Sequence, residues 1–344
     1  MSNLRLFLLL LIIPVVFFPF VFFLAKSAEY RLGIFWDVVS FTIVFVTAFS
    51  VYCASANNKI YMNSRSIELK FNFLKESFLY SAFMGTTLGF VGLWAATGGS
   101  EEGGYIWMIL GHSIAIALLT DAYGIGYYFS STLLQNILEK KSDLQDKVTS
   151  KYHSNTSLSF ILLIMPLIIY ALCIFLLSSN PDIDFDYIFT IYRNIIISFL
   201  LIFFVIGSLL VGSNFKIVIK SYFNISLEVN ELIATINDLK KLSRLMSIVT
   251  GIITIFCLVV GGWLFTSEDL DINRAFELIP LIFSISIVCI LYIRTFIFRL
   301  NLELVELNHM QIDSDKYFIF KYCLPTYIVI QIVNGFGFLI MIFK

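Results

Sequence analysis

Long apolar stretches alternate with short polar ones along the whole chain. A helix needs roughly 20 apolar residues to cross the hydrocarbon core of a bilayer. Segments of about that length or longer are Leu4–Leu24, Gly33–Ala56, Phe78–Thr97, Tyr105–Leu138, Leu158–Ser178, Tyr187–Val218, Leu245–Phe265, Ala275–Phe298 and Tyr317–Phe343. Several exceed the length of one span, which predicts tilt or helical extension into the cytosol. The pattern therefore predicts an all-α fold, a polytopic transmembrane helical bundle of about nine spans.

Composition supports a membrane protein and narrows the classes of function. Of 344 residues, 59% are hydrophobic and 14% are charged, which is more apolar surface than a soluble domain of this length can bury. The formal net charge of −1 speaks against nucleic acid as a partner. The five cysteines show no CxxC spacing and the three histidines form no HExxH pattern. The sequence therefore predicts no disulfide, metal site or organic cofactor.

The distribution of charge predicts the orientation. The first apolar segment is too long for a signal peptide and lacks a cleavage site after it, so we expect it to be retained as a span. Lysine and arginine concentrate on the cytoplasmic side of membrane proteins. With the N-terminus inside, the inner loops hold Lys59, Arg65, Lys70, Lys75, Lys140, Lys141, Lys147, Lys151, Lys216, Lys220, Lys240, Lys241, Arg244, Arg294, Arg299, Lys316 and Lys321. The outer loops are acidic, with Glu101, Glu102, Asp182, Asp184, Asp186, Glu268, Asp269 and Asp271. We therefore expect a cytoplasmic N-terminus and an outside C-terminus.

Asp121 lies within a turn of the centre of the fourth apolar segment, whereas Glu76 and Asp37 lie at span edges, where water or headgroups can satisfy them. A charged carboxylate at the bilayer centre costs about 2.5–3.5 kcal/mol on insertion scales, so such residues usually have a function. We expect Asp121 to carry a proton or to bind an ion. The alternative is a structural role, in which a protonated Asp121 donates a hydrogen bond to a neighbouring helix.

Hydroxyl and small residues surround this acid in the sequence. Hydroxyl groups can relay a proton or replace part of the hydration shell of an ion, and glycines let membrane helices pack closely. The predicted ion pathway consists of Asp121, Thr120, Thr86 and Thr87, and the predicted helix-packing positions are Gly85, Gly89, Gly124 and Gly126. The alternative reading of the same residues is that they only hold helices together.

Two stretches carry a resemblance to a known family. Residues 85–93 read GTTLGFVGL and residues 114–126 read IAIALLTDAYGIG. They resemble the paired channel helices of the MotA/TolQ/ExbB proton-channel family, which carry Gly-Thr-x-x-Gly-x-x and Ala-Leu-x-Thr-Thr/Ala-Thr-x-x-Gly stretches. The resemblance covers residues 1–150 and is strongest over 85–136. Asp121 stands where that family usually has threonine, and the loop 57–75 is shorter than the torque-transmitting domain of flagellar stators.

The resemblance implies a division of the chain and a function. Residues 1–150 would form a four-span MotA/TolQ/ExbB-like channel unit. Residues 151–344 would add five spans, which we interpret as a degenerate repeat of the first unit plus one span. A homo-oligomeric ring would surround a one-span, Asp-containing membrane subunit, with Thr86 and Thr120 lining the path of H⁺ or Na⁺. The protein would then be a stator-like ion-channel subunit of the bacterial inner membrane that couples an ion gradient to mechanical or transport work.

Two other functions remain open on the sequence. The first is a secondary transporter or flippase-like carrier that uses Asp121 as its coupling site. The second is a membrane enzyme acting on lipid-linked substrates, for which the outer cluster Asp182, Asp184 and Asp186 is the candidate site, since such a spacing can hold a divalent ion.

The inner loop 224–244 shows helical spacing of its apolar residues, with Leu227, Leu232, Ile236 and Leu239 near one face. This predicts an amphipathic helix lying at the membrane surface, or alternatively a docking helix for a partner.

Overall fold

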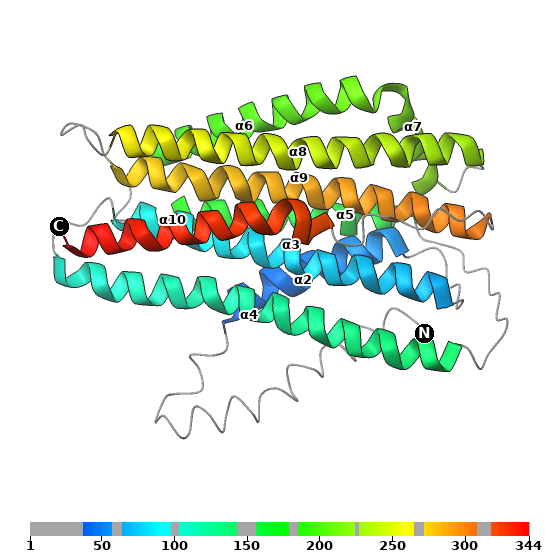
Figure 1. Cartoon of the computed structure of the whole chain (residues 1–344), viewed down its shortest axis with the longest axis horizontal. Helices are drawn as coiled ribbons and strands as arrows, with labels where there is room; N and C mark the ends of the chain where they lie inside the picture. The colour runs from blue at the N-terminus through cyan, green and yellow to red at the C-terminus, as the bar shows by residue number, and fades with distance from the viewer. Residues whose placement is uncertain are drawn as a thin grey trace.

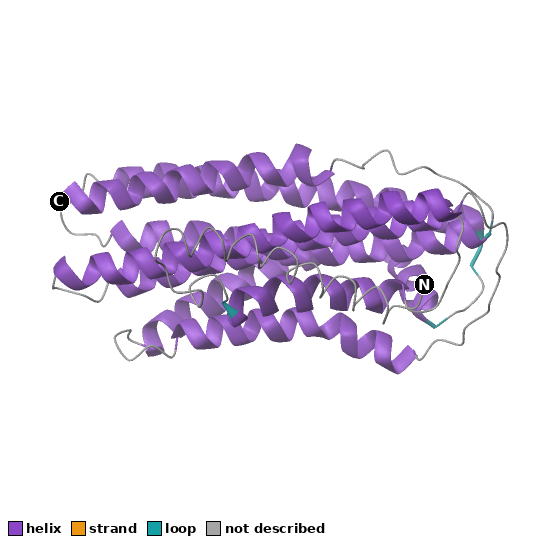
Figure 2. Cartoon of the chain, turned by 90° about the horizontal axis from the view of Figure 1, so that it is seen from below, coloured by secondary structure: helices purple, strands orange, loops and turns teal. Residues whose placement is uncertain are grey.

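The computed structural model describes residues 37–56, 64–97, 103–142, 156–178, 185–223, 227–264, 272–307 and 318–343, and the regular structure within these ranges is entirely helical (Figures 1 and 2). The helices are α2 (Val38–Ala56), α3 (Ser64–Thr97), α4 (Gly103–Ser142), α5 (Thr156–Ser178), α6 (Phe185–Leu210), η2 (Gly212–Asn214), α7 (Phe215–Tyr222), α8 (Val229–Leu264), α9 (Ile272–Glu306), η3 (Ile319–Cys323) and α10 (Leu324–Phe343). The all-α prediction is confirmed for the part of the chain that is described.

The predicted apolar segments from the second onward are mainly helical where they are described, while Leu4–Leu24 lies outside the described residues. Among the described residues, four stretches qualify as membrane spans by length and apolarity: Val38–Ala56, Leu158–Phe175, Val229–Val259 and Leu278–Val305. A fifth is added if α6 and α7 count as one span. The structure is therefore that of a helical membrane protein, and the count of nine spans and the orientation of the termini stay predictions.

The sixth predicted segment, Tyr187–Val218, is not one continuous helix. The chain bends by 97° between Ile196–Leu210 and the short helix α7. Gly212 makes this bend with a φ of +49°, a backbone conformation that favours glycine because other residues have a Cβ atom that clashes there. The expectation of tilt or simple extension is replaced here by a turn of nearly a right angle.

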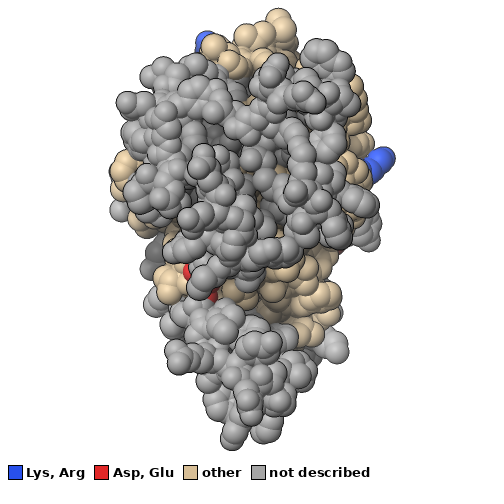
Figure 3. Space-filling model, turned by 90° about the vertical axis from the view of Figure 1, so that its left-hand side faces the viewer, with Lys and Arg blue, Asp and Glu red and all other residues tan. Residues whose placement is uncertain are grey.

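Helix α9 lies inside the bundle, between α3 on one side and α8 on the other (Figure 1). Of the most apolar stretch of α9, 89% is buried by the rest of the chain, compared with 33% of the corresponding stretch in α5 and in α8. Helices α5 and α8 therefore turn apolar faces outward, as lipid-facing helices do. In the end-on view of Figure 3, most of the described surface is neither acidic nor basic.

The amphipathic segment within 224–244 has a different role from the one expected. It is the first part of the long helix α8, and Leu232, Ile236 and Leu239 are fully buried in the core of the bundle. Its apolar face is thus covered by the protein's own helices, chiefly α9, rather than by the membrane surface or a partner.

Helices from both sides of residue 150 share one core. Helix α3 packs closely along both α4 and α9, and a single cluster of buried residues runs from α2 to α10. One core therefore includes residues from both sides of residue 150, while the division into two units and the repeat relationship between them stay predictions.

Candidate functional site

Both oxygens of the Asp121 carboxyl group have a hydroxyl donor, and the two donors come from different helices. The hydroxyl of Thr86 on α3 donates to Oδ1 at 2.8 Å. The hydroxyl of Tyr327 on α10 donates to Oδ2. Asp121 itself lies on α4 and is half-buried. The site therefore forms where three helices meet.

Thr86 has a second acceptor within reach. Its Oγ1 lies 3.0 Å from the carbonyl oxygen of Ala117, one turn before Asp121 on α4. A hydroxyl group has one proton to donate and lone pairs to accept with. Thr86 can therefore donate to a charged Asp121, or donate to Ala117 and accept a hydrogen bond from a protonated Asp121.

Aromatic packing holds the Tyr327 ring in place. The ring stacks on Phe83 of α3, with centroids 4.1 Å apart and planes 17° from parallel, and lies 6.0 Å from the ring of Phe283 on α9. Its hydroxyl also lies beside the side chains of Thr86 and Gln331. The tyrosine is therefore a fixed donor, oriented toward Asp121 by both α3 and α9.

Three of the four predicted packing glycines bring α3 and α4 together. A Cβ atom added at Gly124 would lie 2.3 Å from the Cβ of Ala82, and one at Gly85 would lie 2.5 Å from Cγ2 of Thr120. At Gly89 the nearest atom, Cβ of Ala117, would be 3.2 Å away. A Cβ at Gly126 would meet nothing within 4 Å. The close approach of α3 to α4, which puts Thr86 against Asp121, thus depends on the first three positions.

The other two predicted pathway residues point elsewhere. The Thr87 hydroxyl donates to the carbonyl oxygens of Phe83 and Met84 on its own helix, at 2.7 and 2.9 Å. The Thr120 hydroxyl donates to Oγ of Ser40 on α2 at 3.0 Å. The Thr86 hydroxyl therefore reaches Asp121, whereas the bonds described for Thr87 and Thr120 go to other groups, and a role for those two in ion movement stays a prediction.

No family model, no curated protein and no solved structure matches this chain.

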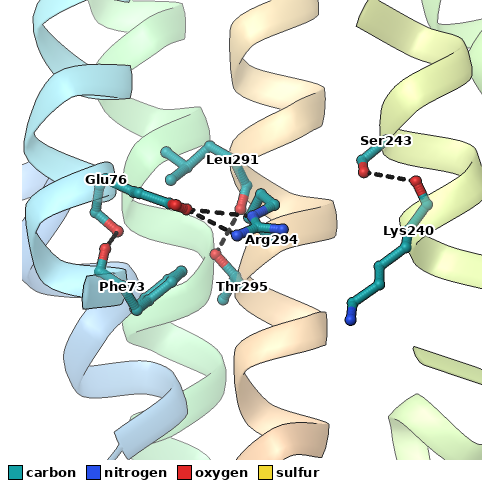
Figure 4. Close-up of polar contacts among 8 residues, drawn as sticks. Phe73, Glu76, Lys240, Ser243, Leu291, Arg294 and Thr295 are labelled. Atoms are coloured by element: carbon teal, nitrogen blue, oxygen red, sulfur yellow. Dashed lines mark hydrogen bonds and ion pairs between the residues drawn. The ribbon is translucent and has the colours of Figure 1, made fainter. Parts of the chain in front are cut away.

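Two charged residues lie in places that differ from the sequence prediction. Glu76 does not lie at a solvated span edge, and Arg294 does not lie in a loop. They form a buried ion pair between α3 and α9, with Nη2 and Nε of Arg294 at 3.0 and 3.2 Å from Oε2 of Glu76 (Figure 4). The guanidinium group also lies over the ring of Phe318 at 5.1 Å. This pair links α3 to α9, and both of its residues are far from Asp121 in the sequence.

Arg299, one and a half turns further along α9, is also buried rather than in a loop. It donates to the carbonyl oxygens of Ser55 at 3.1 Å and Ser221 at 2.6 Å, and pairs with Glu303 at 3.2 Å. Carbonyl groups at helix C-termini lack intrahelical donors, so one arginine here satisfies the ends of α2 and α7 together.

The residues that sequence reasoning missed had a visible pattern on the last helix. Tyr327, Gln331 and Asn334 recur at spacings of four and three, which places them on one helix face. Asn334 accepts a hydrogen bond from Nε1 of Trp94 at 2.8 Å, so this polar face is turned toward α3. Such a face in a long apolar segment would have indicated polar partners elsewhere in the bundle.

The described residues contain no group of three or more His, Cys, Asp or Glu side chains placed to hold a metal ion. Of the outer acidic cluster, Asp182 and Asp184 lie outside the described residues, and Asp186 is in the first turn of α6.

Proposed function

We propose that this chain is an integral membrane protein that moves H⁺ or Na⁺ along a path centred on Asp121. The observation that carries the proposal is the pair of hydroxyl donors, Thr86 and Tyr327, on the two oxygens of one carboxyl group within an apolar bundle. Two donors stabilise the charged carboxylate, so the acid can release its proton without being left unsatisfied. The protein would have about nine spans with its N-terminus in the cytoplasm of a bacterium.

Thr86 supports proton exchange because it fits both states of the acid. When Asp121 is charged, Thr86 donates to Oδ1. When Asp121 is protonated, Thr86 donates to the Ala117 carbonyl and its oxygen accepts from the acid. A site that satisfies both states with the same atoms lowers the cost of passing between them.

The stator-like form of the proposal follows the resemblance of residues 85–126 to MotA/TolQ/ExbB channel helices. In that form, several copies of this chain surround a one-span subunit with its own Asp, and ion flow drives movement or transport. The glycine-dependent contact of α3 with α4 is what such paired channel helices would require.

A self-contained carrier is the second candidate, and the Asp121–Tyr327 contact favours it. This contact joins residues 206 positions apart within one chain, so the acid has its donors without a partner subunit. Opening the contact between α10 and α4 would expose Asp121 to one side, as alternating access requires.

Ion flux in proteoliposomes tests the common core of both forms. The purified protein is reconstituted with a pH-sensitive dye inside, and proton entry is measured under an imposed membrane potential, with Na⁺ uptake measured in parallel. We expect Asp121→Asn to abolish flux while leaving expression and assembly unchanged. Full activity of Asp121→Asn would make the acid structural and refute the proposal.

Thr86→Val and Thr87→Val form a matched pair on the same helix. Both hydroxyls are buried, but only that of Thr86 reaches Asp121. We expect a roughly tenfold loss of flux for Thr86→Val, corresponding to about 1.4 kcal/mol for one hydrogen bond, and near wild-type flux for Thr87→Val. Equal effects of the two would contradict the assigned geometry.

Purification in mild detergent separates the two forms. A one-span companion that co-purifies with this chain supports the stator-like form. Flux by a single purified component supports the carrier.

A further inference from the structure

We propose that the helix α7 binds the headgroup of an anionic phospholipid. The first observation is its direction. The chain bends by 97° between α6 and α7, so if α6 crosses the bilayer, α7 lies nearly in the plane of the membrane. A helix lying in that plane can place its apolar side chains in the acyl region and its polar ones at the level of the headgroups.

The second observation is the division of the exposed face of α7. Phe215, Ile219 and Phe223, the residue directly after the helix, recur at four-residue spacing and are each about half exposed, which makes one apolar stripe. Lys216 and Lys220 are exposed directly beside them and make a parallel basic stripe. Aromatic and aliphatic side chains next to two lysines complement a lipid that has both acyl chains and a negative headgroup.

The third observation is that the opposite face holds α7 rigidly in place. Its start is fixed by Asn214, whose Nδ2 donates to Oδ2 of Asp238 on α8 at 3.0 Å. Its end is fixed by Arg299, which binds the Ser221 carbonyl at 2.6 Å and lies over the Tyr222 ring at 5.4 Å. The two lysines are therefore presented by a fixed helix, so little conformational freedom is lost when a headgroup binds.

Charge around the site favours an anion. The nearby carboxylate of Asp238 is paired with Lys241 at 3.2 Å, so its negative charge is balanced locally. Lys216 and Lys220 also belong to a predicted inner loop, and the inner leaflet carries the anionic lipids that attract such residues. An anionic phospholipid of that leaflet is the occupant that fits both stripes.

Spin-labelled lipids test the proposal on the full chain. The protein is reconstituted in phosphatidylcholine vesicles that contain a minority of phosphatidylglycerol, and electron paramagnetic resonance measures the fraction of each labelled lipid immobilised by the protein. We expect wild-type protein to prefer phosphatidylglycerol, and Lys216→Gln/Lys220→Gln to lower this preference by about fivefold for each lysine lost. Raising the salt concentration should weaken the wild-type preference, because salt screens exposed charges.

Two further variants keep the test sharp. Lys216→Arg/Lys220→Arg keeps both charges and should keep the preference. Lys321→Gln removes one exposed lysine on another helix, changes the net charge as much as either single variant Lys216→Gln or Lys220→Gln, and should leave the preference largely intact. An unchanged preference in Lys216→Gln/Lys220→Gln, or a loss in Lys321→Gln equal to that in Lys216→Gln, would overturn a site on α7.

Discussion

The buried ion pair between α3 and α9 offers the sharpest test of the packing. Glu76→Gln keeps the shape of the side chain and removes its charge. The two side chains are only 8% and 7% exposed, so Arg294 would be left charged in an apolar interior. Breaking a buried pair in this way typically costs about 3–5 kcal/mol, because the remaining buried charge loses the carboxylate that balanced it.

A second pair in the same molecule provides the control. Lys241 and Asp238 on α8 are 3.2 Å apart, but their side chains are 66% and 24% exposed. An exposed pair contributes about 0–1 kcal/mol, because water already solvates both charges. We therefore expect Lys241→Gln to leave stability nearly unchanged.

Thermal unfolding in mild detergent, followed by fluorescence-detected size-exclusion chromatography, measures the difference. At roughly 2–4 °C for each kcal/mol, Glu76→Gln should lower Tm by on the order of 10 °C and Lys241→Gln by no more than about 4 °C. The double variant Glu76→Leu/Arg294→Met replaces the pair with apolar side chains and should recover most of the loss. Equal Tm values for Glu76→Gln and Lys241→Gln would refute the burial argument. A double variant as unstable as Glu76→Gln would show that the loss of stability comes from side-chain shape and not from charge.

Three further predictions concern the site and its supports. Gly124→Ala should destabilise the protein by about 1–3 kcal/mol because the new methyl group meets α3, whereas Gly126→Ala has open space and should be neutral or slightly stabilising; thermal unfolding compares the two. Tyr327→Phe removes a donor from Asp121 at nearly constant volume and should cost about 1–3 kcal/mol, with reduced ion flux in proteoliposomes as the second readout. Arg299→Met should release the end of α7, so that hydrogen–deuterium exchange rises there more than in α3; unchanged exchange would contradict its role in holding that helix.

The helices could be predicted from the sequence because the length of an apolar stretch is a local property. The segments Tyr105–Leu138 and Leu158–Ser178 agree closely with α4 and α5. The break at Gly212 was not predicted, since a glycine in an apolar run does not by itself indicate a positive φ.

The partners of the polar residues could not be predicted in the same way. Glu76 and Arg294 are 218 positions apart, and nothing local says that one neutralises the other. A charge near the end of an apolar segment was therefore assigned to water or headgroups, the commonest solution. Asp121 can be predicted from the sequence because the free-energy cost of a charged carboxylate in hydrocarbon does not depend on its partner. Thr86 can be predicted because it lies on the preceding helix in the sequence. Tyr327 was missed because its helix follows much later.

The distance along the chain between Asp121 and Tyr327 has a consequence for biosynthesis. Tyr327 follows Asp121 by 206 residues, which a ribosome adds in about 10 to 40 s at 5–20 residues per second. Throughout that interval the nascent protein holds an acid with Thr86 but without its second donor. The carboxyl group gains its second hydrogen-bond donor only when α10 docks, so a prematurely terminated chain would hold Asp121 with one donor fewer. Membrane proteases could distinguish such a chain from the finished protein by that difference alone.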